Sequence, residues 1–333
     1  MYSIKLFLLL FIFCISLNIH SQDNSDFRPE DRARLKEAFD ICNEYGDMLW
    51  KGWTKIPYTA LFVTDSNEYL INHPSPTSNF VLIGYDSMFQ SAMYKRPRKF
   101  QTNFLAAFDA VNNISTIVVG NPENTGRSSL MWIISVIHEH FHQLQDAQND
   151  YDSGVKELDL AGNDSTGMWM LNYPFPYEDT AVAQQFKILT IAAQSAAFSD
   201  EKDFSEKYNN FTAEKKKFKG LLSEKDYRYF SFQLWNEGIA MYTELKVFEM
   251  IKDKRQAPAE IQKLSDYISY SDAYQKKLGN IRDVSVKLKL EESKRACFYY
   301  IGALEGIILD RINPNWREMY FKKKFNIDEY FIK

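Results

Sequence analysis

The sequence predicts an α+β fold in which a small sheet is followed by a mainly helical part. Short runs typical of β-strands are confined to the stretch from Tyr58 to Gly120, where clusters of Asn, Pro, Ser and Gly separate them. Longer segments with apolar residues at helical spacing dominate the rest of the chain. Strands that come first and helices that come later favour α+β over an alternating parallel sheet.

The first 21 residues are expected to be a cleaved signal peptide. Lys5 supplies a short basic region, Leu6 to Leu17 is an apolar run of twelve residues, and Ser21 offers a small residue for cleavage. The apolar run is too short to span a bilayer as a helix, so no stable membrane insertion is expected after its removal. The mature protein is therefore expected to be exported, either periplasmic or secreted.

Residues 22–333 are expected to form a single domain, with an α+β part at 22–126 that holds the sheet and a mainly helical part at 127–333. The formal net charge is −4, and a mildly acidic chain argues against nucleic acid as a partner. Two cysteines, Cys42 and Cys297, lie beyond the signal peptide. They can pair in an oxidising compartment, but Cys42 lies on the apolar face of a predicted helix, which favours two buried thiols.

The N-terminal part begins with a helix, predicted at 29–50 from apolar residues at i, i+3 and i+4 spacing. β-strands are predicted at 59–63, 80–84 and 115–120. Asn121 to Gly126 is a loop, after which Ser128 or Ser129 is expected to cap the next helix.

That next helix carries His138-Glu139-His140-Phe141-His142, which reads H-E-x-x-H within a strongly apolar stretch. Residues four apart share one face of a helix, so His138 and His142 can bind one metal ion. Glu139 lies where a metal-bound water would sit and can accept its proton, which is the arrangement of a zinc peptidase. His140 points about 160° away from the metal face and is expected to be structural. The alternative is a histidine cluster that is satisfied in the core or by solvent.

A catalytic zinc site usually has three protein ligands and a water, so a third ligand is expected from another helix. Glu237 is the best candidate, because it lies two turns before Glu244 on one face of an apolar segment. Two buried carboxylates on one face repel each other unless a cation lies between them. Zinc bound by Glu237, with Glu244 accepting a hydrogen bond from another ligand, resolves that repulsion. Glu178 or Glu244 is the next candidate for the third ligand. Gly238, which has no side chain, allows a neighbouring helix to pack closely.

Ninety-four residues separate His142 from Glu237. In this stretch, 149–176 is predicted to be a loop whose aromatic residues either shape a cleft or pack in the core, and 178–198 is predicted to be a helix. Asp146, one turn beyond His142, either orients that imidazole or faces the solvent.

Together, His138-Glu139-x-x-His142 and Asn236-Glu237-Gly238-x-Ala240 resemble the motifs of the gluzincin metallopeptidases, particularly the aminopeptidase-N-like branch. The resemblance implies a thermolysin-like zincin domain in which Glu237 binds Zn²⁺ and in which Asn236 and Glu244 support the ligands. Tyr299-Tyr300-Ile301-Gly302-Ala303 is similar to a Y-x-x-G-A segment of that family. This similarity implies that Tyr299 donates a hydrogen bond to the oxyanion of the tetrahedral intermediate. The alternatives for this role are Tyr300, Tyr173 and Tyr177.

The expected function is that of an exported zinc-dependent peptidase that acts on a peptide or protein. Ser115 to Gly120 is a candidate edge strand along which an extended peptide can lie. The G-x-M-E-N segment that binds a free amino terminus in the aminopeptidase branch is absent from the sequence, so cleavage within peptides is expected. Glu123 is the nearest acidic candidate if the protein is instead an aminopeptidase.

Two further functions are compatible with the same motifs. One is hydrolysis of a non-peptide bond, such as an ester or an epoxide, on the same zinc scaffold. The other belongs to a different class, a non-catalytic binding protein that keeps the zincin fold. The presence of Glu139 disfavours this second function, because a site that no longer catalyses a reaction would commonly lose its base first.

Overall fold

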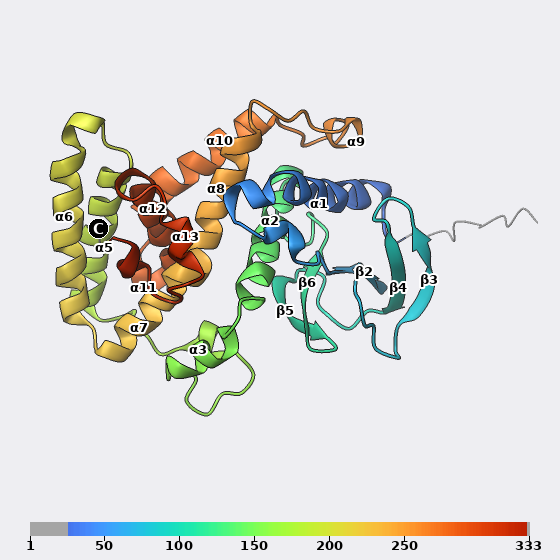
Figure 1. Ribbon diagram of the computed structural model, residues 1–333, viewed down its shortest axis with the longest axis horizontal. Coiled ribbons are helices and arrows are strands. Elements are labelled where there is room, and N and C mark those ends of the chain that lie inside the picture. Colours follow the sequence, from blue (N-terminus) through green and yellow to red (C-terminus); the bar gives the residue numbers. More distant parts are fainter. Residues whose placement is uncertain (1–25, 332–333) are drawn as a thin grey trace, which may run out of the picture.

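The strands of the protein form one mixed sheet beside a larger group of helices, as a computed structural model of residues 26–331 shows (Figure 1). The fold class is α+β, as predicted from the sequence. The sheet lies at one end of the molecule, and the long helices α5 (Thr180–Ala197) and α6 (Glu201–Leu221) lie at the other. The predicted signal peptide lies outside the described residues. Among the helices within 26–331, none combines the length and apolar character that crossing a membrane requires.

The sheet has the strand order β3-β4-β2-β1-β6-β5. Only β1 and β6 run parallel; every other neighbouring pair is antiparallel. The strands at 59–63, 80–84 and 115–120 are present as predicted, and the other three were not anticipated. The bounds are β1 (Ala60–Val63), β2 (Asn67–Ile71), β3 (Val81–Asp86), β4 (Ser91–Pro97), β5 (Leu105–Val111) and β6 (Ile114–Gly120).

The expectation that Ser115 to Gly120 forms an edge strand is wrong. The corresponding strand β6 lies between β1 and β5, because a tight hairpin folds β5 back along its outer side. The edge on this side of the sheet is therefore β5, which pairs Leu105 with Val119 and Phe108 with Thr116.

Both faces of the central strands are buried, which explains why β1 is apolar at every position. Ala60 and Phe62 face the main core, which the sheet shares with the helices. Leu61 and Val63 face a smaller apolar cluster on the other side, against which three phenylalanines between β4 and the end of β5 pack: Phe100, Phe104 and Phe108.

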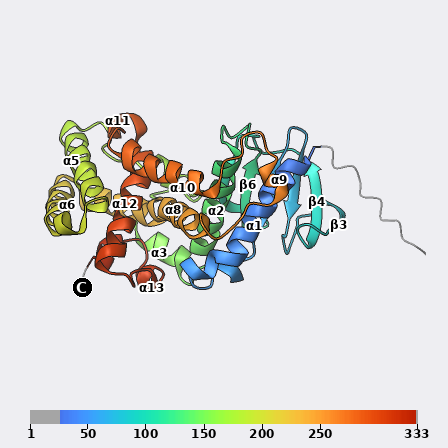
Figure 2. The ribbon, with the colours of Figure 1, turned by 90° about the horizontal axis from the view of Figure 1, so that it is seen from above.

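Two helices connect the sheet to the main core. They are α1 (Pro29–Leu49), which agrees with the prediction, and α2 (Ser129–Asp146), which runs between the sheet and the helical part (Figures 1 and 2). Trp132 of α2 donates from Nε1 to the carbonyl of Gly120 at 2.8 Å. This bond fixes α2 to the end of β6.

The N-terminus of α2 is not capped by a serine side chain, contrary to expectation. The Ser128 side chain makes no cap hydrogen bond, and Ser129 acts as a donor. The carboxylate of Asp266, distant in sequence, accepts from the Ser129 backbone N–H at 2.6 Å and from its Oγ at 2.7 Å. A carboxylate supplies the negative charge that a helix N-terminus favours, and only the tertiary fold brings it there.

The helical part consists of long helices joined by short ones. The helix predicted at 178–198 is α5, and the predicted loop at 149–176 contains two short helices. Trp169 and Phe175 are buried and pack in the core, and Phe175 also lines a hollow of about 520 Å³ together with Tyr173 and Tyr177. The remaining segments are η1 (Trp53–Lys55), α3 (Tyr151–Glu157), α4 (Trp169–Asn172), α7 (Glu224–Gln233), η2 (Leu234–Gly238), α8 (Ile239–Ile251), α9 (Ala259–Gln262), α10 (Tyr270–Gly279), η3 (Asn280–Val284), α11 (Leu290–Ser293), α12 (Ala296–Ile312), α13 (Arg317–Tyr320) and η4 (Ile327–Tyr330).

A contact between glycines brings α12 against the turn that carries Glu237. A Cβ atom placed on Gly302 would lie 2.6 Å from the Cα of Gly238 and 3.0 Å from the carbonyl oxygen of Leu234. Such distances exclude any side chain, so the two backbones touch, as the sequence suggested for Gly238.

Both cysteines are buried free thiols. Cys42 and Cys297 form no disulfide with each other. The structure therefore agrees with the alternative of two buried thiols, which the position of Cys42 on the apolar face of a helix favoured.

Candidate metal centre

Helix α2 presents two imidazoles side by side. His138 and His142 lie one turn apart, and their Nε2 atoms are 3.1 Å from each other. Both residues are largely buried, because α2 lies between the sheet and the helical part. The apolar sequence around them thus places two polar rings within the core.

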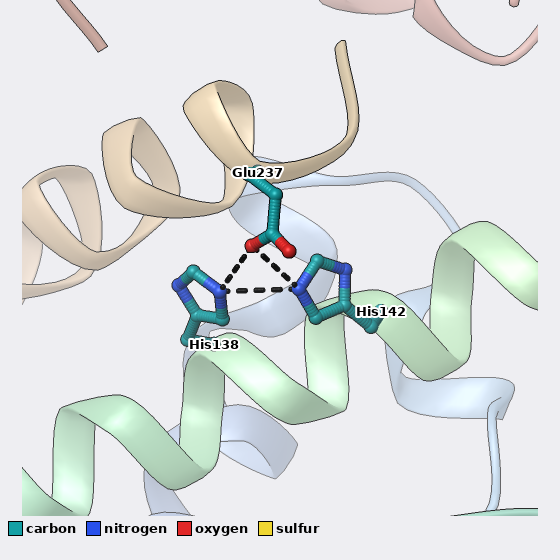
Figure 3. Close-up of side chains that lie close together, drawn as sticks. All are labelled: His138, His142 and Glu237. Carbon is teal, nitrogen blue, oxygen red and sulfur yellow. Dashed lines mark hydrogen bonds and ion pairs between the residues drawn. The ribbon is translucent and has the colours of Figure 1, made fainter. Parts of the chain in front are cut away.

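Glu237 completes the group from the opposite side (Figure 3). Its Oε2 atom lies 3.4 Å from Nε2 of His138 and 3.4 Å from Nε2 of His142. The residue belongs to η2, a π-helical turn between α7 and α8. Such turns insert one extra residue into a helix and occur frequently at functional sites.

The tautomer of His138 is fixed by a charged pair behind it. Nδ1 of His138 lies 2.8 Å from Oε1 of Glu244, and Lys277 donates to Oε2 of the same carboxylate at 2.6 Å. A carboxylate that is paired with an ammonium group can only accept, so Nδ1 of His138 must be the donor. In the neutral imidazole, Nε2 then carries the free lone pair.

The tautomer of His142 is fixed by Gln145. The amide nitrogen of Gln145 lies against three acceptors, namely the carbonyl oxygens of Trp235 and Asn236 and the hydroxyl of Tyr320. The amide oxygen therefore faces Nδ1 of His142, at 2.6 Å, and accepts its proton. As in His138, Nε2 keeps its lone pair.

Two residues expected to support the ligands are placed differently from their predictions. Asn236 acts through its backbone carbonyl, which accepts from Gln145 at 3.1 Å; its side chain makes no hydrogen bond to a ligand. Asp146 accepts from Oγ of Ser115 at 2.9 Å, and burial raises its pKa to about 6. Asp146 thus neither orients His142 by a hydrogen bond nor faces open solvent.

The three inward atoms have the spacing that a zinc ion requires. Ligand atoms about 2.0–2.1 Å from a tetrahedral ion lie about 3.3 Å from one another. The observed separations are 3.1 Å and twice 3.4 Å. When both imidazoles are neutral, their Nε2 lone pairs and a carboxylate oxygen converge here, so the donor set fits a divalent cation.

The surrounding charges favour a cation at this place. Burial lowers the pKa of His138, but hydrogen bonds to Glu237 and Glu244 outweigh burial and raise it to about 10. Burial raises the pKa of Glu244, whereas Lys277 and His138 lower it to a net value of about 2. For Glu237 the neighbouring imidazoles also outweigh burial, so its pKa lies well below the usual range. Without a metal ion, a proton on His138 supplies the positive charge that these carboxylates favour; a divalent cation would displace that proton and supply the charge instead.

Glu139 lies beside the ligands without joining them. It is 6% exposed, and its Oε2 accepts from the backbone N–H of Ala107 in β5 at 2.8 Å. Burial raises its pKa, and the nearby His138 and His142 lower it, with a net upward shift. A carboxyl whose pKa is shifted towards neutrality is suited to general acid–base catalysis.

Tyr299 and Arg295, one turn apart at the start of α12, close another side of the group. The Tyr299 ring stacks on His138 with a centroid separation of 6.2 Å. Arg295 donates from Nη1 to the Tyr299 hydroxyl at 2.7 Å and lies 3.4 Å from Oε1 of Glu237. Burial raises the pKa of Tyr299 well above its usual value, so the phenol remains a proton donor.

His140 lies outside the site, as predicted. It is buried, its Nδ1 pairs with Gln143 at 2.8 Å, and its ring stacks on Tyr58 at 3.9 Å. Burial lowers its pKa to about 4, which keeps the ring neutral.

No hydrogen bond or ion pair joins His138, His142 or Glu237 to the remaining candidates, Glu178, Glu123, Tyr173 and Tyr177. Glu178 is exposed, and Glu123 pairs with Arg28 at 2.7 Å. Tyr173 donates to Asp226 at 2.9 Å, and Tyr177 packs on Phe298. A hollow of about 1020 Å³ along α3 and α7 contains none of the residues discussed for the site.

Sequence reasoning missed Lys277, Gln145 and Arg295. Gln145 could have been found, because it lies three residues after His142 and therefore on the same side of α2. Arg295 lies four residues before Tyr299, which is a comparable signal once Tyr299 is assigned. Lys277 comes from a separate helix, α10, and carries no local signal.

Comparisons with protein-family models, with curated proteins and with solved structures give no match for this chain. The chemistry of the site therefore has to be inferred from its own residues.

Proposed function

We propose that this chain is a zinc-dependent peptidase with a thermolysin-like catalytic domain. The observation that carries the proposal is the convergence of three lone-pair donors, Nε2 of His138, Nε2 of His142 and Oε2 of Glu237, with Glu139 beside them. Three protein ligands leave one coordination position open, which is typical of catalytic rather than structural zinc. The side chains of the three ligands are 9–13% exposed, so the group is reached from solvent.

When bound, Zn²⁺ polarises the substrate carbonyl and lowers the pKa of a coordinated water. Glu139 accepts the proton of the attacking water and passes it to the leaving amine. Tyr299 donates its hydroxyl proton as a hydrogen bond to the oxyanion as negative charge develops there. Arg295 donates a hydrogen bond to the Tyr299 oxygen, and the Tyr299 hydroxyl also interacts with Glu237, so the phenol is held beside the ligand group.

The position of strand β5 favours a peptide over other substrates. As the sheet edge next to α2, it presents backbone groups that no neighbouring strand pairs. The Ala107 N–H points outward to Glu139, and alternation along an antiparallel strand places the outward groups of Leu105 on the same side. An extended peptide can add to this edge with its backbone close to the metal ligands.

The site is better suited to attack within peptides than to removal of amino-terminal residues. An aminopeptidase needs acidic groups for the substrate ammonium, yet Glu123 is engaged by Arg28 at the surface. The cationic Arg295 lies beside Glu237 and disfavours an ammonium group there.

The test combines metal analysis with turnover of a mixed peptide library, with and without a chelator. The parent should contain about one zinc per chain, as a three-ligand site requires. Glu139→Gln should retain zinc and lose cleavage, because Glu139 is not a ligand. Glu237→Ala should lose the zinc, whereas Glu178→Ala, at an exposed glutamate, serves as the matched control. A Glu237→Ala variant that binds zinc as tightly as the parent would contradict the proposed ligand set.

A further inference from the structure

Arg295 is a partly buried cation at the edge of the metal centre. Its side chain is 29% exposed, and its one carboxylate contact among residues 26–331 is Oε1 of Glu237 at 3.4 Å. Its one short hydrogen bond in this part of the chain runs from Nη1 to the neutral hydroxyl of Tyr299. The guanidinium therefore has no close anionic partner of its own among the described residues.

Most of the guanidinium fork is unused. Within residues 26–331, Nε and Nη2 of Arg295 donate to no protein atom. Arg255, by contrast, contacts both oxygens of Glu37 at 2.8 and 2.9 Å. Arg317 contacts Asp310 at 2.8 Å.

Metal binding would leave Arg295 still less compensated. The single negative charge of Glu237 is shared with the two imidazoles and would be taken up by a divalent ion. A desolvated cation is costly without a partner, and a planar fork of donors matches a carboxylate best. The missing anion must then come from the bound molecule.

We propose that Arg295 binds a carboxylate of the substrate close to the scissile bond. The inference rests on the proposed peptidase function and names its substrate class, namely peptides with a negative charge next to the point of cleavage. Nη1 already lies 3.4 Å from a metal-ligand carboxylate, and one extended residue spans about 3.5 Å. The charge recognised is therefore within one or two residues of the attacked carbonyl. It is supplied either by a free carboxyl terminus or by an Asp or Glu side chain.

The experiment measures binding without turnover, by calorimetry on zinc-loaded Glu139→Gln protein. The probes are acetylated tetrapeptides of alanine and phenylalanine. One has a free carboxyl terminus, and its neutral twin has the same terminus amidated. The others are amidated and carry a single aspartate, or a single asparagine as its neutral twin, at each position in turn. We expect the parent background to bind one of the charged forms about 10- to 100-fold more tightly than its neutral twin, as a charge-assisted hydrogen bond provides. The acid–amide pair and the aspartate–asparagine pairs identify the source of the carboxylate.

Adding Arg295→Gln should abolish that preference, so that each charged peptide binds with the same affinity as its neutral twin. Arg295→Lys keeps the positive charge but loses the planar set of guanidinium donors, so it should retain part of the preference for the charged peptide. Arg282→Gln is the matched control, because Arg282 is an exposed arginine paired with Asp283 and should leave the preference intact. Equal affinity for every charged and neutral pair, or no measurable binding of any probe, would overturn the proposal.

Kinetics on the active zinc protein separate this proposal from the proposed function. Loss of the contact with Tyr299 should lower kcat for charged and neutral peptides alike. The substrate-carboxylate role requires an additional loss of kcat/KM for the charged peptides, and an equal fold-loss for both kinds of peptide refutes it. If the parent cleaves no peptide but the charged probes bind through Arg295, the carboxylate-binding role of Arg295 is supported and the peptidase function is refuted.

Discussion

The orientations of His138 and His142 each depend on a residue outside the group that they form with Glu237. His138 is held by Glu244, which Lys277 keeps ionised, and His142 is held by Gln145. Both partners act by accepting the Nδ1 proton, which leaves Nε2 free to bind an ion. The two histidines thus have equivalent roles but different supports, one charged and one neutral.

Replacing Gln145 by leucine should weaken zinc binding about 10- to 100-fold, because His142 loses the acceptor that fixes its tautomer. Gln143 offers a matched control on the same helix, since it is buried and pairs with the non-ligand His140. Gln143→Leu should lower stability without changing zinc affinity. The measurement is the zinc dissociation constant by competition with a chelator, and equal losses in both variants would argue against the specific role of Gln145.

Replacing Tyr299 by phenylalanine should lower kcat about 100-fold and change KM little, because the hydroxyl acts mainly on the transition state. Tyr300→Phe removes the adjacent hydroxyl, which makes no hydrogen bond to the ligand group, and should have no such effect. Steady-state kinetics on a single peptide compare the two variants. A loss in Tyr300→Phe and not in Tyr299→Phe would transfer the role to the neighbouring phenol.

At the site, local spacing was predictable and long-range partners were not. The i, i+4 spacing identified His138 and His142, and the repulsion between two buried carboxylates identified Glu237 and Glu244. Lys277 and the capping residue Asp266 come from distant segments whose positions depend on the complete fold. The spacing of residues in the sequence does not predict such contacts.

At the scale of the elements, a π-helical turn and a pair of glycines position Glu237. Glu237 lies in η2, and Gly238 directly after it touches Gly302 of α12. Because Tyr299 lies on the same helix as Gly302, one contact sets the distance between the ligand and the phenol. The apolar spacing predicted a regular helix here and did not reveal the π-helical turn.

Gly302→Ala should therefore disturb the metal centre from outside it. The added methyl group would lie 2.6 Å from Gly238 Cα, so α12 and η2 must separate, at a cost of about 1–3 kcal/mol in stability. Zinc affinity and kcat should both fall. Gly220→Ala, with no atom within 4 Å of the added group, should remain as stable as the parent or gain slightly. Thermal unfolding and zinc titration of the two variants make the comparison; unchanged zinc affinity in Gly302→Ala would refute the positional role of this contact.

Only part of the sheet was predictable from the sequence. Strands β1 and β6 are buried on both faces and are recognisable as apolar runs, whereas the edge strand β5 is mostly half-exposed. Its pairing with β6 depends on the hairpin at Asn112 and Asn113, both at positive φ. The Asn-Asn pair is the local signal for this turn, but three of the seven residues of β5 are alanine, which is depleted in strands.

At the scale of the whole molecule, a buried charge cluster links α6, α12 and η4. Lys215 donates to Glu305 at 2.6 Å and also pairs with Asp328, so two carboxylates share one ammonium group. Burial raises the pKa of Glu305; Lys215 lowers it and Asp328 raises it, which leaves a net value of about 7. One oxygen of Glu305 is buried without a hydrogen-bond partner among the described residues.

Stability should consequently fall as pH rises across this window. A carboxyl whose pKa is 4.5 when unfolded and about 7 when folded binds its proton more tightly in the folded state. The stabilisation is complete below pH 4.5 and is lost towards pH 7, by up to about 3 kcal/mol. Glu305→Gln removes the carboxyl that titrates. The unfolding free energy of this variant minus that of the parent should therefore increase between pH 4 and pH 8. Denaturant unfolding at each pH measures the difference, and a constant difference would refute the assignment.

Because Gln145 donates a hydrogen bond to Tyr320, its full set of partners requires α13, which is synthesised after the other residues of the site. The three ligand atoms have all been translated once η2 has emerged from the ribosome, but the hydroxyl that helps to orient Gln145 arrives only with α13. A nascent chain that has reached α8 can therefore contain His138, His142 and Glu237 while His142 is still incompletely fixed. Because chains are elongated from the amino terminus and segments fold as they are released, Gln145 gains all of its hydrogen-bond partners only after α13 has been synthesised.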